Sequence, residues 1–169
     1  LGLHASALPQ NRGGAPVNWA LIRGECEVGL SLFEFVEKVD DGDVFAQTTV
    51  PIESRDDVGT VYDRITVAAR ELVKKTLAEI AAEKAIPTPQ DRSMATYLPQ
   101  RKPEDGIIDW SRSASDIVNW VRALTDPYPG AFTFYRGQRI TVWSAEEVSV
   151  QHDTPPGTIL AVEDGVGVP

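Results

Sequence analysis

The feature that most restricts the fold of this sequence is a single change of hydrophobic period. Residues 28–36 alternate and are rich in β-forming side chains, and residues 44–52 read as a second strand. From residue 58 to 83 the apolar side chains recur at steps of three and four residues, which predicts one long amphipathic helix. Asp56 or Asp57 is placed to cap its first turn. A helix of this kind most simply covers a sheet, so we expect an α/β fold with residues 28–36 inside the sheet.

The second half of the chain carries shorter patterns. Residues 113–125 recur at helical spacing and are followed by prolines and a glycine, which predicts a second helix that ends there. Residues 131–143 alternate on both sides of an Arg-Gly-Gln turn, which predicts a hairpin. Residues 157–162 repeat the strand pattern before a turn at 163–165. Short strands at this spacing suggest the start of a small β-barrel.

Between the two halves, residues 86–106 hold four prolines, scattered charges and no period. Such a segment is typical of a connection between domains. We therefore divide the chain into residues 1–90, a linker at 91–104 and a second domain at 105–169. Because large aromatic side chains usually pack, we expect the four tryptophans to lie mostly in the core or at a domain contact. They are Trp19, Trp110, Trp120 and Trp143.

The balance of residues narrows the class of protein. With 42% hydrophobic and 24% charged residues over 169 positions, the chain is typical of globular proteins. No apolar run approaches the length that crosses a membrane. The net charge of −9 is the opposite of what a general nucleic-acid binder shows, which weighs against a large tRNA substrate.

The start of the chain and its cysteine content bear on where the protein works. The sequence opens at Leu1 without an initiator methionine and shows no secretory leader, so we expect a fragment or numbering that begins at the first ordered residue. Cys26 is the single cysteine, which excludes an internal disulfide and a thiolate metal cluster. A cytoplasmic protein without a metal site fits both observations.

Three features of the first half could carry chemistry. The first is His4. The second is the glycine-bearing loop Arg12–Pro16, whose proline suits the first turn of a predicted short helix at 17–22. The third is the acidic turn Val39–Asp43, which follows a predicted strand. Taken singly, each favours a structural role, because lone histidines and acidic turns are usually structural.

Taken together, these features resemble the signature of the formyltransferases that use 10-formyltetrahydrofolate. Residues 1–25 read LGLHASALPQNRGGAPVNWALIRGE and residues 28–43 read VGLSLFEFVEKVDDGD. The family pattern is Asn-x-His, then Ser-Leu-Leu-Pro, Arg-Gly, Pro, Gly-Glu and Asp-x-Gly-Asp. The 36 positions from His4 to Asp40 match that pattern without a gap. Residues 109–143 resemble the C-terminal domain of the longer members.

The resemblance implies a fold and a formyl donor. Residues 1–90 would be the later half of a Rossmann-like formyltransferase domain, and residues from 105 would begin a small β-rich domain that is OB-like. The donor would be 10-formyltetrahydrofolate, held near Val39 and Asp40. No metal is implied, and the oligomeric state is left open.

The family chemistry gives a role to His4 and Asp40. Formyl transfer is attack by a neutral amine on a carbonyl carbon, through a tetrahedral intermediate that carries an oxyanion. An imidazole at His4 can donate to that anion when Asp40 favours its charged form, and Asp40 can organise the group that takes the proton of the amine. We expect the pair to face one pocket at the C-terminal edge of the sheet. In the family the first acid of the turn is catalytic, so Asp40 is assigned rather than Asp41 or Asp43.

The resemblance also implies that the segment after His4 binds the acceptor. The glycine-bearing loop would lie at the mouth of the pocket, where missing side chains let the backbone approach a ligand. Its arginine would contact an anionic acceptor or pair with a local carboxylate, and both interpretations stay open. The implied substrate-binding residues are Ser6, Leu8, Pro9, Arg12, Gly13 and Pro16.

The sequence departs from the family pattern at one position. Gly2 stands where the family has its catalytic asparagine, two residues before the histidine. One donor to the formyl oxygen is therefore missing. Either a backbone amide replaces it, or the activity is altered, or the chain is a non-catalytic relative.

Family members differ in the amine that they formylate. Glycinamide ribonucleotide formyltransferase lacks the C-terminal domain, so residues 109–169 argue against it. Residues 119–132 (NWVRALTDPYPGAF) are similar to the formyltransferase part of the enzyme that modifies UDP-aminoarabinose. The acidic balance also suits a small nucleotide-sugar better than tRNA. We therefore predict an amino-sugar nucleotide as acceptor, with methionyl-tRNA as the alternative and a hydrolase that passes formyl to water as a further one.

Overall fold

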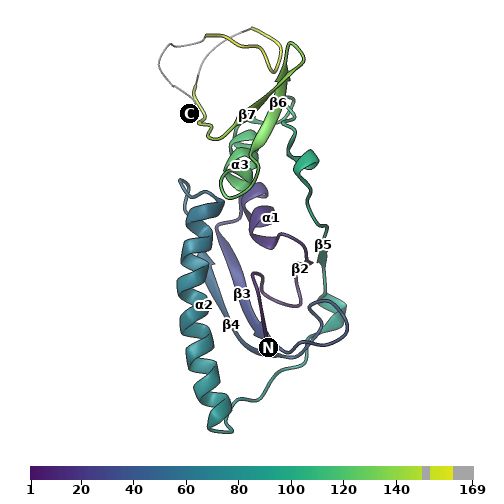
Figure 1. Cartoon of the computed structure of the whole chain (residues 1–169), viewed down its shortest axis with the longest axis vertical. Helices are drawn as coiled ribbons and strands as arrows, with labels where there is room; N and C mark the ends of the chain where they lie inside the picture. The colour runs from purple at the N-terminus through teal and green to yellow at the C-terminus, as the bar shows by residue number, and fades with distance from the viewer. Residues whose placement is uncertain (150–152, 162–169) are drawn as a thin grey trace.

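The computed structural model describes residues 1–149 and 153–161 of the chain. A body of sheet and helix occupies one end of an elongated molecule, and a helix with a hairpin occupies the other (Figure 1). Two short 3-10 helices, Arg92–Met94 and Pro103–Gly106, lie in the connection between them. The strands are β1 Gly2–His4, β2 Arg12–Gly13, β3 Glu27–Phe33, β4 Val44–Pro51, β5 Tyr97–Leu98, β6 Ala131–Tyr135 and β7 Gln138–Val142, and the helices are α1 Pro16–Ile22, α2 Val58–Ala81 and α3 Ala114–Leu124.

The central sheet has three strands in the order β1-β3-β4, and both pairings are antiparallel. The middle place of β3 confirms that this segment lies inside the sheet. The strand ends at Phe33 rather than at residue 36, and Phe35 beyond it is 70% exposed. Together with the covering helix, this sheet confirms the predicted α/β class.

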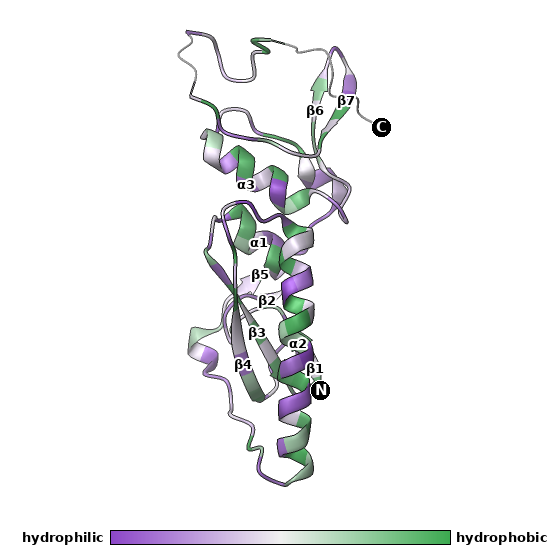
Figure 2. Ribbon diagram, turned by 90° about the vertical axis from the view of Figure 1, so that its left-hand side faces the viewer, coloured by the Kyte–Doolittle hydropathy of each residue, from purple (hydrophilic) through white to green (hydrophobic). Residues whose placement is uncertain are grey.

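Helix α2 packs on this sheet, as its period predicts. Its buried residues Val58, Val61 and Ile65 share one core with apolar side chains of β3 and β4. Burying one such side chain contributes roughly 1.5–3 kcal/mol. Figure 2 shows hydrophilic and hydrophobic bands alternating along α2. Within the part of the chain that the structure describes, neither α2 nor any other helix is apolar over a bilayer-spanning length.

The first turn of α2 is closed by reciprocal hydrogen bonds. The Asp57 carboxylate accepts from the Thr60 N–H at 2.9 Å, and the Thr60 hydroxyl accepts from the Asp57 N–H at 3.0 Å. We expect Asp57→Ala to lower the free energy of unfolding by about 1 kcal/mol, because an amide donor of the first turn loses its acceptor. Urea unfolding measures this change. Asp63→Ala, an exposed position on the same helix, is the matched control; equal losses in the two variants would contradict the capping role.

The connection between the two parts packs against the first part. Strand β5 pairs in parallel with β2, which places Arg12 opposite Tyr97. Thr88 exchanges two backbone hydrogen bonds with Val44, at 2.9 and 2.8 Å. The segment predicted as a linker at 91–104 therefore contains a strand that belongs to the first part. A pairing of two residues leaves no period in the sequence, so the pattern could not predict it.

The second part is held to the first by hydrogen bonds between side chains and carbonyl oxygens. The Asn18 amide nitrogen on α1 donates to the Ala123 carbonyl of α3 at 2.7 Å. The Arg122 guanidinium donates to the carbonyls of Glu53 and Asp56 at 3.2 and 3.1 Å. These contacts fix α3 against the body that carries the sheet.

Beyond α3, the described residues contain the predicted hairpin of β6 and β7. Residues 157–161 are not a strand, so the strand predicted at 157–162 is wrong over that range. Val162 and the turn predicted at 163–165 lie outside the described residues. Among the described residues this hairpin forms a sheet of two strands, and Trp110 and Trp143 are exposed. The packing prediction is therefore wrong for these two tryptophans, whereas Trp19 and Trp120 are partly buried.

Candidate active site

His4 is the last residue of β1 and lies beside Ser31 of the central strand. Its side chain is 9% exposed, and its Nε2 lies 2.8 Å from the Asn11 carbonyl oxygen. A carbonyl only accepts, so Nε2 carries the proton of this hydrogen bond. The bond fixes the plane of the ring and leaves Nδ1 as the nitrogen that faces away from it.

Asp40 faces that free nitrogen. Its Oδ2 lies 3.6 Å from His4 Nδ1 and accepts the Gly13 N–H at 2.8 Å. A separation of 3.6 Å is longer than a hydrogen bond, so the two groups form an ion pair when the ring is charged. In the neutral ring Nδ1 would turn a lone pair toward the carboxylate. Only the charged ring would turn an N–H from Nδ1 toward Asp40.

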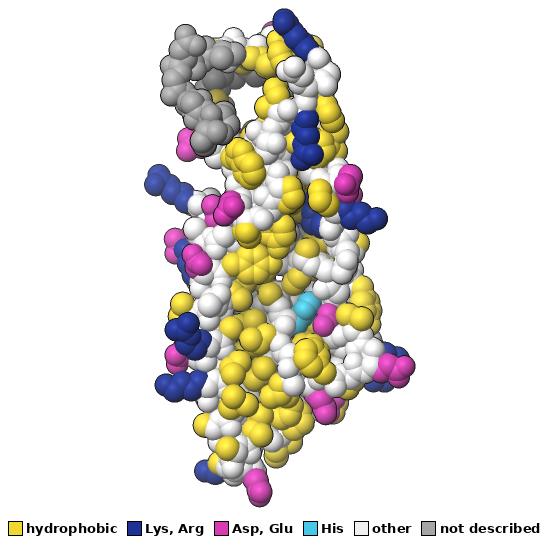
Figure 3. All heavy atoms as spheres, in the orientation of Figure 1, with side chains coloured by type: hydrophobic (Ala, Val, Ile, Leu, Met, Phe, Trp, Pro, Cys, Tyr) yellow, Lys and Arg dark blue, Asp and Glu magenta, His cyan; other side chains and the backbone are white. Residues whose placement is uncertain are grey.

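The backbone of Asp40 is held in the left-handed region, with φ of 53°. Aspartate tolerates that region better than most residues, and strained backbone of this kind often accompanies functional sites. Among the described residues Asp40 Oδ1 has no hydrogen-bond partner, whereas Oδ2 has one. The carboxylate thus keeps one acceptor oxygen for a group from outside. Figure 3 shows a histidine next to an acidic side chain on the face viewed, among hydrophobic side chains.

The sequence predicted that these two residues meet, and the structure brings them together by a different route. The prediction placed them at the common carboxyl edge of neighbouring strands. Strands β1 and β3 run antiparallel and share no such edge. Asp40 reaches His4 from the loop between β3 and β4, which is closed by a hydrogen bond from the Glu34 N–H to the Asp43 carbonyl at 2.9 Å.

Arg12 lies under this loop and is 1% exposed. Its Nη1 donates to Asp41 Oδ1 at 2.6 Å and to the Tyr97 hydroxyl at 3.0 Å. Its Nε and Nη2 both donate to the Gln90 side-chain oxygen, at 3.2 and 2.7 Å. Four hydrogen bonds therefore hold the guanidinium inside the protein. Of the two interpretations left open, the structure shows the pairing with a local carboxylate, and a contact of Arg12 with substrate stays a prediction.

Gln90 is the residue of this site that the sequence did not reveal. Besides accepting from Arg12, its amide nitrogen donates to the carbonyls of Asp40 and Gly42, at 2.8 and 2.6 Å. It thereby ties the acidic loop to the buried guanidinium. Gln90 sits in the proline-rich connection, where neither period nor motif distinguishes it.

The carboxyl group of Asp41 is held ionised. Burial by itself would raise its pKa, but hydrogen bonds from Arg12 and Arg92 outweigh burial and hold the pKa below its ordinary range. In the unfolded chain these partners are absent and the ordinary pKa of about 4 returns. The folded state therefore gains stability from Asp41 above about pH 4, and loses it as the pH falls through the lowered folded-state pKa.

We predict that this stabilisation disappears in acid. The difference in Tm between the parent protein and Asp41→Asn should be largest near pH 7 and should shrink below about pH 4. Thermal unfolding followed by circular dichroism between pH 7 and pH 2 tests this. Asp63→Asn, at an exposed position of α2, should follow the parent at every pH. A difference for Asp41→Asn that does not vary with pH would contradict the assignment.

The other predicted substrate contacts divide into two groups. Ser6 and Leu8 are buried, and the Ser6 hydroxyl donates to the Gln10 carbonyl at 2.7 Å, and their contact with substrate stays a prediction. Pro9, Gly13 and Pro16 are partly exposed, and their role stays a prediction.

The glycine-bearing loop is shaped by the protein itself. Gly13 has φ of 93°, and a Cβ there would lie 2.6 Å from the Leu98 carbonyl of β5. The neighbouring strand alone is therefore enough to require glycine here.

Gly2 is closely covered by a phenylalanine. A Cβ at Gly2 would lie 2.4 and 2.6 Å from two ring atoms of Phe35. The ring is the end of a flexible and largely exposed side chain, so it can turn aside. An asparagine at this position therefore requires Phe35 to move and the buried Phe33 ring, 3.1 Å from that Cβ, to give slightly.

Within residues 1–149 and 153–161, no three of the His, Cys, Asp and Glu side chains are grouped as metal ligands. Val39, the other residue implied in donor binding, is 65% exposed next to Asp40. It is accessible to a ligand, and its role stays a prediction.

Two family models match this sequence. Residues 1–77 match the model described as Formyl transferase, and residues 101–168 match the one described as Formyl transferase, C-terminal domain. Among curated proteins, the chain is 37% identical over 163 residues to methionyl-tRNA formyltransferase of Bacillus subtilis, covering 96% of this chain and 51% of that protein. It is 39% identical over 169 residues to the same enzyme of a Geobacillus species, covering 99% and 53%.

Solved structures with a similar fold point to the same family. HypX from Aquifex aeolicus in complex with tetrahydrofolic acid has a TM-score of 0.73 and 26% identity, over 96% of this chain and 28% of that one. A Mycobacterium tuberculosis protein provisionally assigned as a sugar N-formyltransferase has a TM-score of 0.73 and 26% identity, over 88% and 66%. The present chain spans about half the length of the curated relatives that it matches.

Proposed function

We propose a function from one premise: this chain belongs to the formyltransferase family. Its His4–Asp40 pair would serve an enzyme that moves a formyl group from 10-formyltetrahydrofolate to an amine. The observation that carries the proposal is the ring of His4, held at Nε2 by the Asn11 carbonyl, with Nδ1 3.6 Å from Asp40. The open acceptor at Asp40 Oδ1 and the exposed Val39 beside it fit a donor that approaches along this loop.

The residues of the chain supply proton handling and charge stabilisation. The bound donor supplies the formyl carbon and its oxygen. His4 Nδ1–H, which at 3.6 Å is not hydrogen-bonded to Asp40, would hydrogen-bond the oxygen that becomes negative when the amine attacks. Asp40 Oδ1 would take a proton from the amine, directly or through one water, and that proton would pass to the donor nitrogen when its bond to the formyl carbon breaks. The Gly13 N–H fixes Asp40 Oδ2, which leaves Oδ1 for this transfer.

For the acceptor we propose the amino group of methionine on its initiator tRNA. The relatives that are 37% and 39% identical are both named methionyl-tRNA formyltransferase, and both align with nearly the whole of this chain. The amino-sugar nucleotide predicted from the sequence is retained as a second candidate. It is supported by the net charge of −9 and by the likeness to the Mycobacterium tuberculosis protein.

An assay with the complete gene product separates these candidates. The protein is incubated with 10-formyltetrahydrofolate and methionyl-tRNA, an aminoarabinose nucleotide, or buffer alone. Product is followed by mass spectrometry, and release of tetrahydrofolate by absorbance. Formylation of methionyl-tRNA alone supports the first proposal, and formylation of the sugar alone supports the second. Release of tetrahydrofolate in buffer without an acceptor identifies a hydrolase, and no turnover in any arm overturns the enzyme proposal.

A further inference from the structure

The acidic turn holds Asp40 in a conformation that needs support from outside the turn. Its φ of 53° lies in the left-handed region. A residue other than glycine keeps that conformation only where its surroundings enforce it. Whatever fixes the backbone of Asp40 also fixes where its carboxylate lies relative to the ring of His4. The proposed pair therefore depends on the contacts that hold this turn.

Gln90 supplies such contacts from the connection between the two parts. Its Nε2 donates to the Asp40 carbonyl at 2.8 Å and to the Gly42 carbonyl at 2.6 Å. Gly42 is buried, so its carbonyl oxygen needs a donor inside the protein. The two carbonyls lie on either side of Asp41, so a single side-chain amide clamps the backbone of the turn at two points.

The buried guanidinium of Arg12 sets the orientation of this amide. Gln90 Oε1 accepts from Arg12 Nε and Nη2, at 3.2 and 2.7 Å. A flipped amide would set its oxygen against two carbonyl oxygens and its NH2 group against a cation. The observed orientation is therefore the one in which both N–H groups point to the turn.

The backbone close to Gln90 is itself tied to the sheet. Thr88, two residues before Gln90, exchanges hydrogen bonds of 2.9 and 2.8 Å with Val44, the first residue of β4. Val44 directly follows the acidic turn. The clamp therefore starts from a fixed point at one end of the turn that it holds, which is what precise placement of a functional group requires.

We propose that Gln90 is a positioning residue for formyl transfer, which acts through Asp40 without touching the donor or the acceptor. The inference rests on the proposed function of the His4–Asp40 pair. Gln90 keeps the carboxylate where Oδ2 accepts the Gly13 N–H and lies 3.6 Å from His4 Nδ1. Misplacing a reacting group by about 1 Å can cost about 100-fold in rate.

Two substitutions separate the two ends of the amide. Gln90→Met keeps the length of the side chain and loses both the donor and the acceptor. Gln90→Glu keeps an acceptor for Arg12 but sets an oxygen against the two carbonyls of the turn. Both should lower kcat of the complete gene product about tenfold or more, with the KM of the acceptor within about twofold of the parental value. In urea, Gln90→Glu should lose less stability than Gln90→Met, because Arg12 keeps a partner.

The amide proton of Gly13 reports the place of Asp40 without any turnover. Its exchange with solvent is followed by nuclear magnetic resonance, with neither folate nor amine present. The exchange should be about tenfold faster or more in both Gln90 variants, because the acceptor Oδ2 moves away. This measurement applies even where the parent protein transfers no formyl group. Failure of the proposed function and failure of the positioning role are therefore distinguishable.

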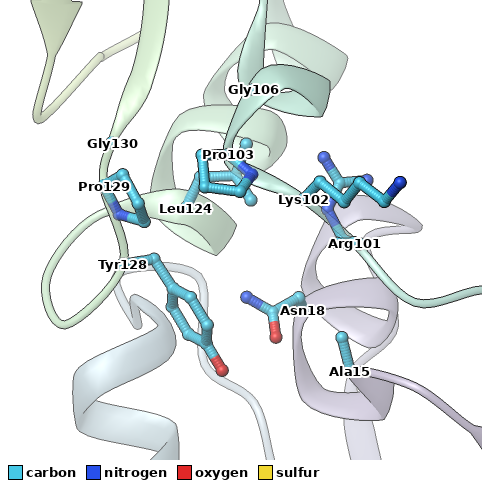
Figure 4. A pocket seen from close by; sticks show the side chains of 10 residues that line it. All are labelled: Ala15, Asn18, Arg101, Lys102, Pro103, Gly106, Leu124, Tyr128, Pro129 and Gly130. Atoms are coloured by element: carbon cyan, nitrogen blue, oxygen red, sulfur yellow. The ribbon is translucent and has the colours of Figure 1, made fainter.

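Tyr128→Phe is the matched control, because it also removes a partly buried side-chain hydrogen bond. The hydroxyls of Tyr128 and Tyr62 lie 3.0 Å apart. Tyr128 lines a pocket of about 160 Å³ where the two parts meet, and neither His4 nor Asp40 is among the lining residues (Figure 4). This variant should keep the parental kcat and the parental exchange rate of the Gly13 N–H.

The positioning role is wrong if kcat simply follows stability. Parental kcat in Gln90→Glu, or equal losses of kcat in the Gln90 variants and in Tyr128→Phe, would show this. A raised KM with parental kcat, or parental exchange of the Gly13 N–H in the Gln90 variants, would also contradict it. If Gln90→Met does not fold, Gln90→Glu alone decides between these outcomes.

Discussion

Replacing His4 by alanine should lower kcat for formyl transfer by about 100-fold or more, with little change in the KM of the acceptor. The reason is that Nδ1–H serves the oxyanion, which exists only in the transition state and not in the bound substrate. Asp40→Ala should have an effect of similar size, because it removes both the carboxylate that favours the charged ring and the base. Steady-state kinetics of the complete gene product measure both quantities.

The control for these two variants is a nearby acid that is not part of the His4–Asp40 pair. Asp43 belongs to the same loop, and its carbonyl closes that loop, whereas no hydrogen bond of its carboxylate is part of the site. Asp43→Asn should therefore keep kcat within a few-fold of the parent. Circular dichroism should show that all three variants are folded. Folded His4→Ala and Asp40→Ala proteins with parental kcat would sink the mechanism.

Arg12→Ala should produce the largest loss of stability, about 3 kcal/mol or more. Removing one member of a buried ion pair leaves the other charge without its partner, and it also empties the space of a large side chain. Arg12 contributes four hydrogen bonds, to Asp41, Tyr97 and Gln90. Urea unfolding at pH 7 measures the loss as a decrease in the midpoint concentration.

Arg92 provides the matched control, because it bonds the same carboxylate from the surface. Its Nη2 lies 2.9 Å from Asp41 Oδ2, but its side chain is 72% exposed. Arg92→Ala should cost less than about 1 kcal/mol, since exposed ion pairs contribute little. If the two arginine variants lose equal stability, burial is not what makes Arg12 important. If Arg12→Ala does not fold, Arg12→Met combined with Asp41→Leu should restore a folded protein, because both charges are then removed together.

The elements that the sequence predicted correctly are those with a sustained local pattern. Helix α2 has its apolar residues at helical steps over 24 residues, and β3 (EVGLSLF) alternates apolar residues with others along most of its length. The pattern could not decide whether Asp56 or Asp57 caps α2, because both precede the helix. In the structure Asp57 forms the reciprocal hydrogen bonds with Thr60, whereas Asp56 pairs with Arg64. The choice depends on tertiary position, which a periodic pattern does not contain.

The residues of the candidate site also divide into those that a local motif predicted and those that depend on tertiary position. The spacing of the family motif predicted that His4 and Asp40 meet, although it gave no account of the antiparallel strands that bring them together. The motif could not assign Arg12, because an arginine at this position serves a ligand or a buried carboxylate equally well. Gln90 escaped detection for a simpler reason. Its partners are 78 and 50 positions away in sequence, and nothing local marks it.

The pairing of β2 with β5 has a consequence for how the protein comes into being. Arg12 and Asn11 reach their partners on Tyr97 and Thr96 across 85 positions of sequence. At a synthesis rate of about 5–20 residues per second, roughly 4–17 seconds separate the appearance of these two segments on the ribosome. Throughout that interval the Arg12 charge lacks Tyr97 and Gln90, and the carbonyl that orients His4 belongs to an unsupported loop. Closure of so long a loop also slows folding relative to local contacts. The proposed catalytic pair therefore cannot take its final form before Thr96 and Tyr97 have been made.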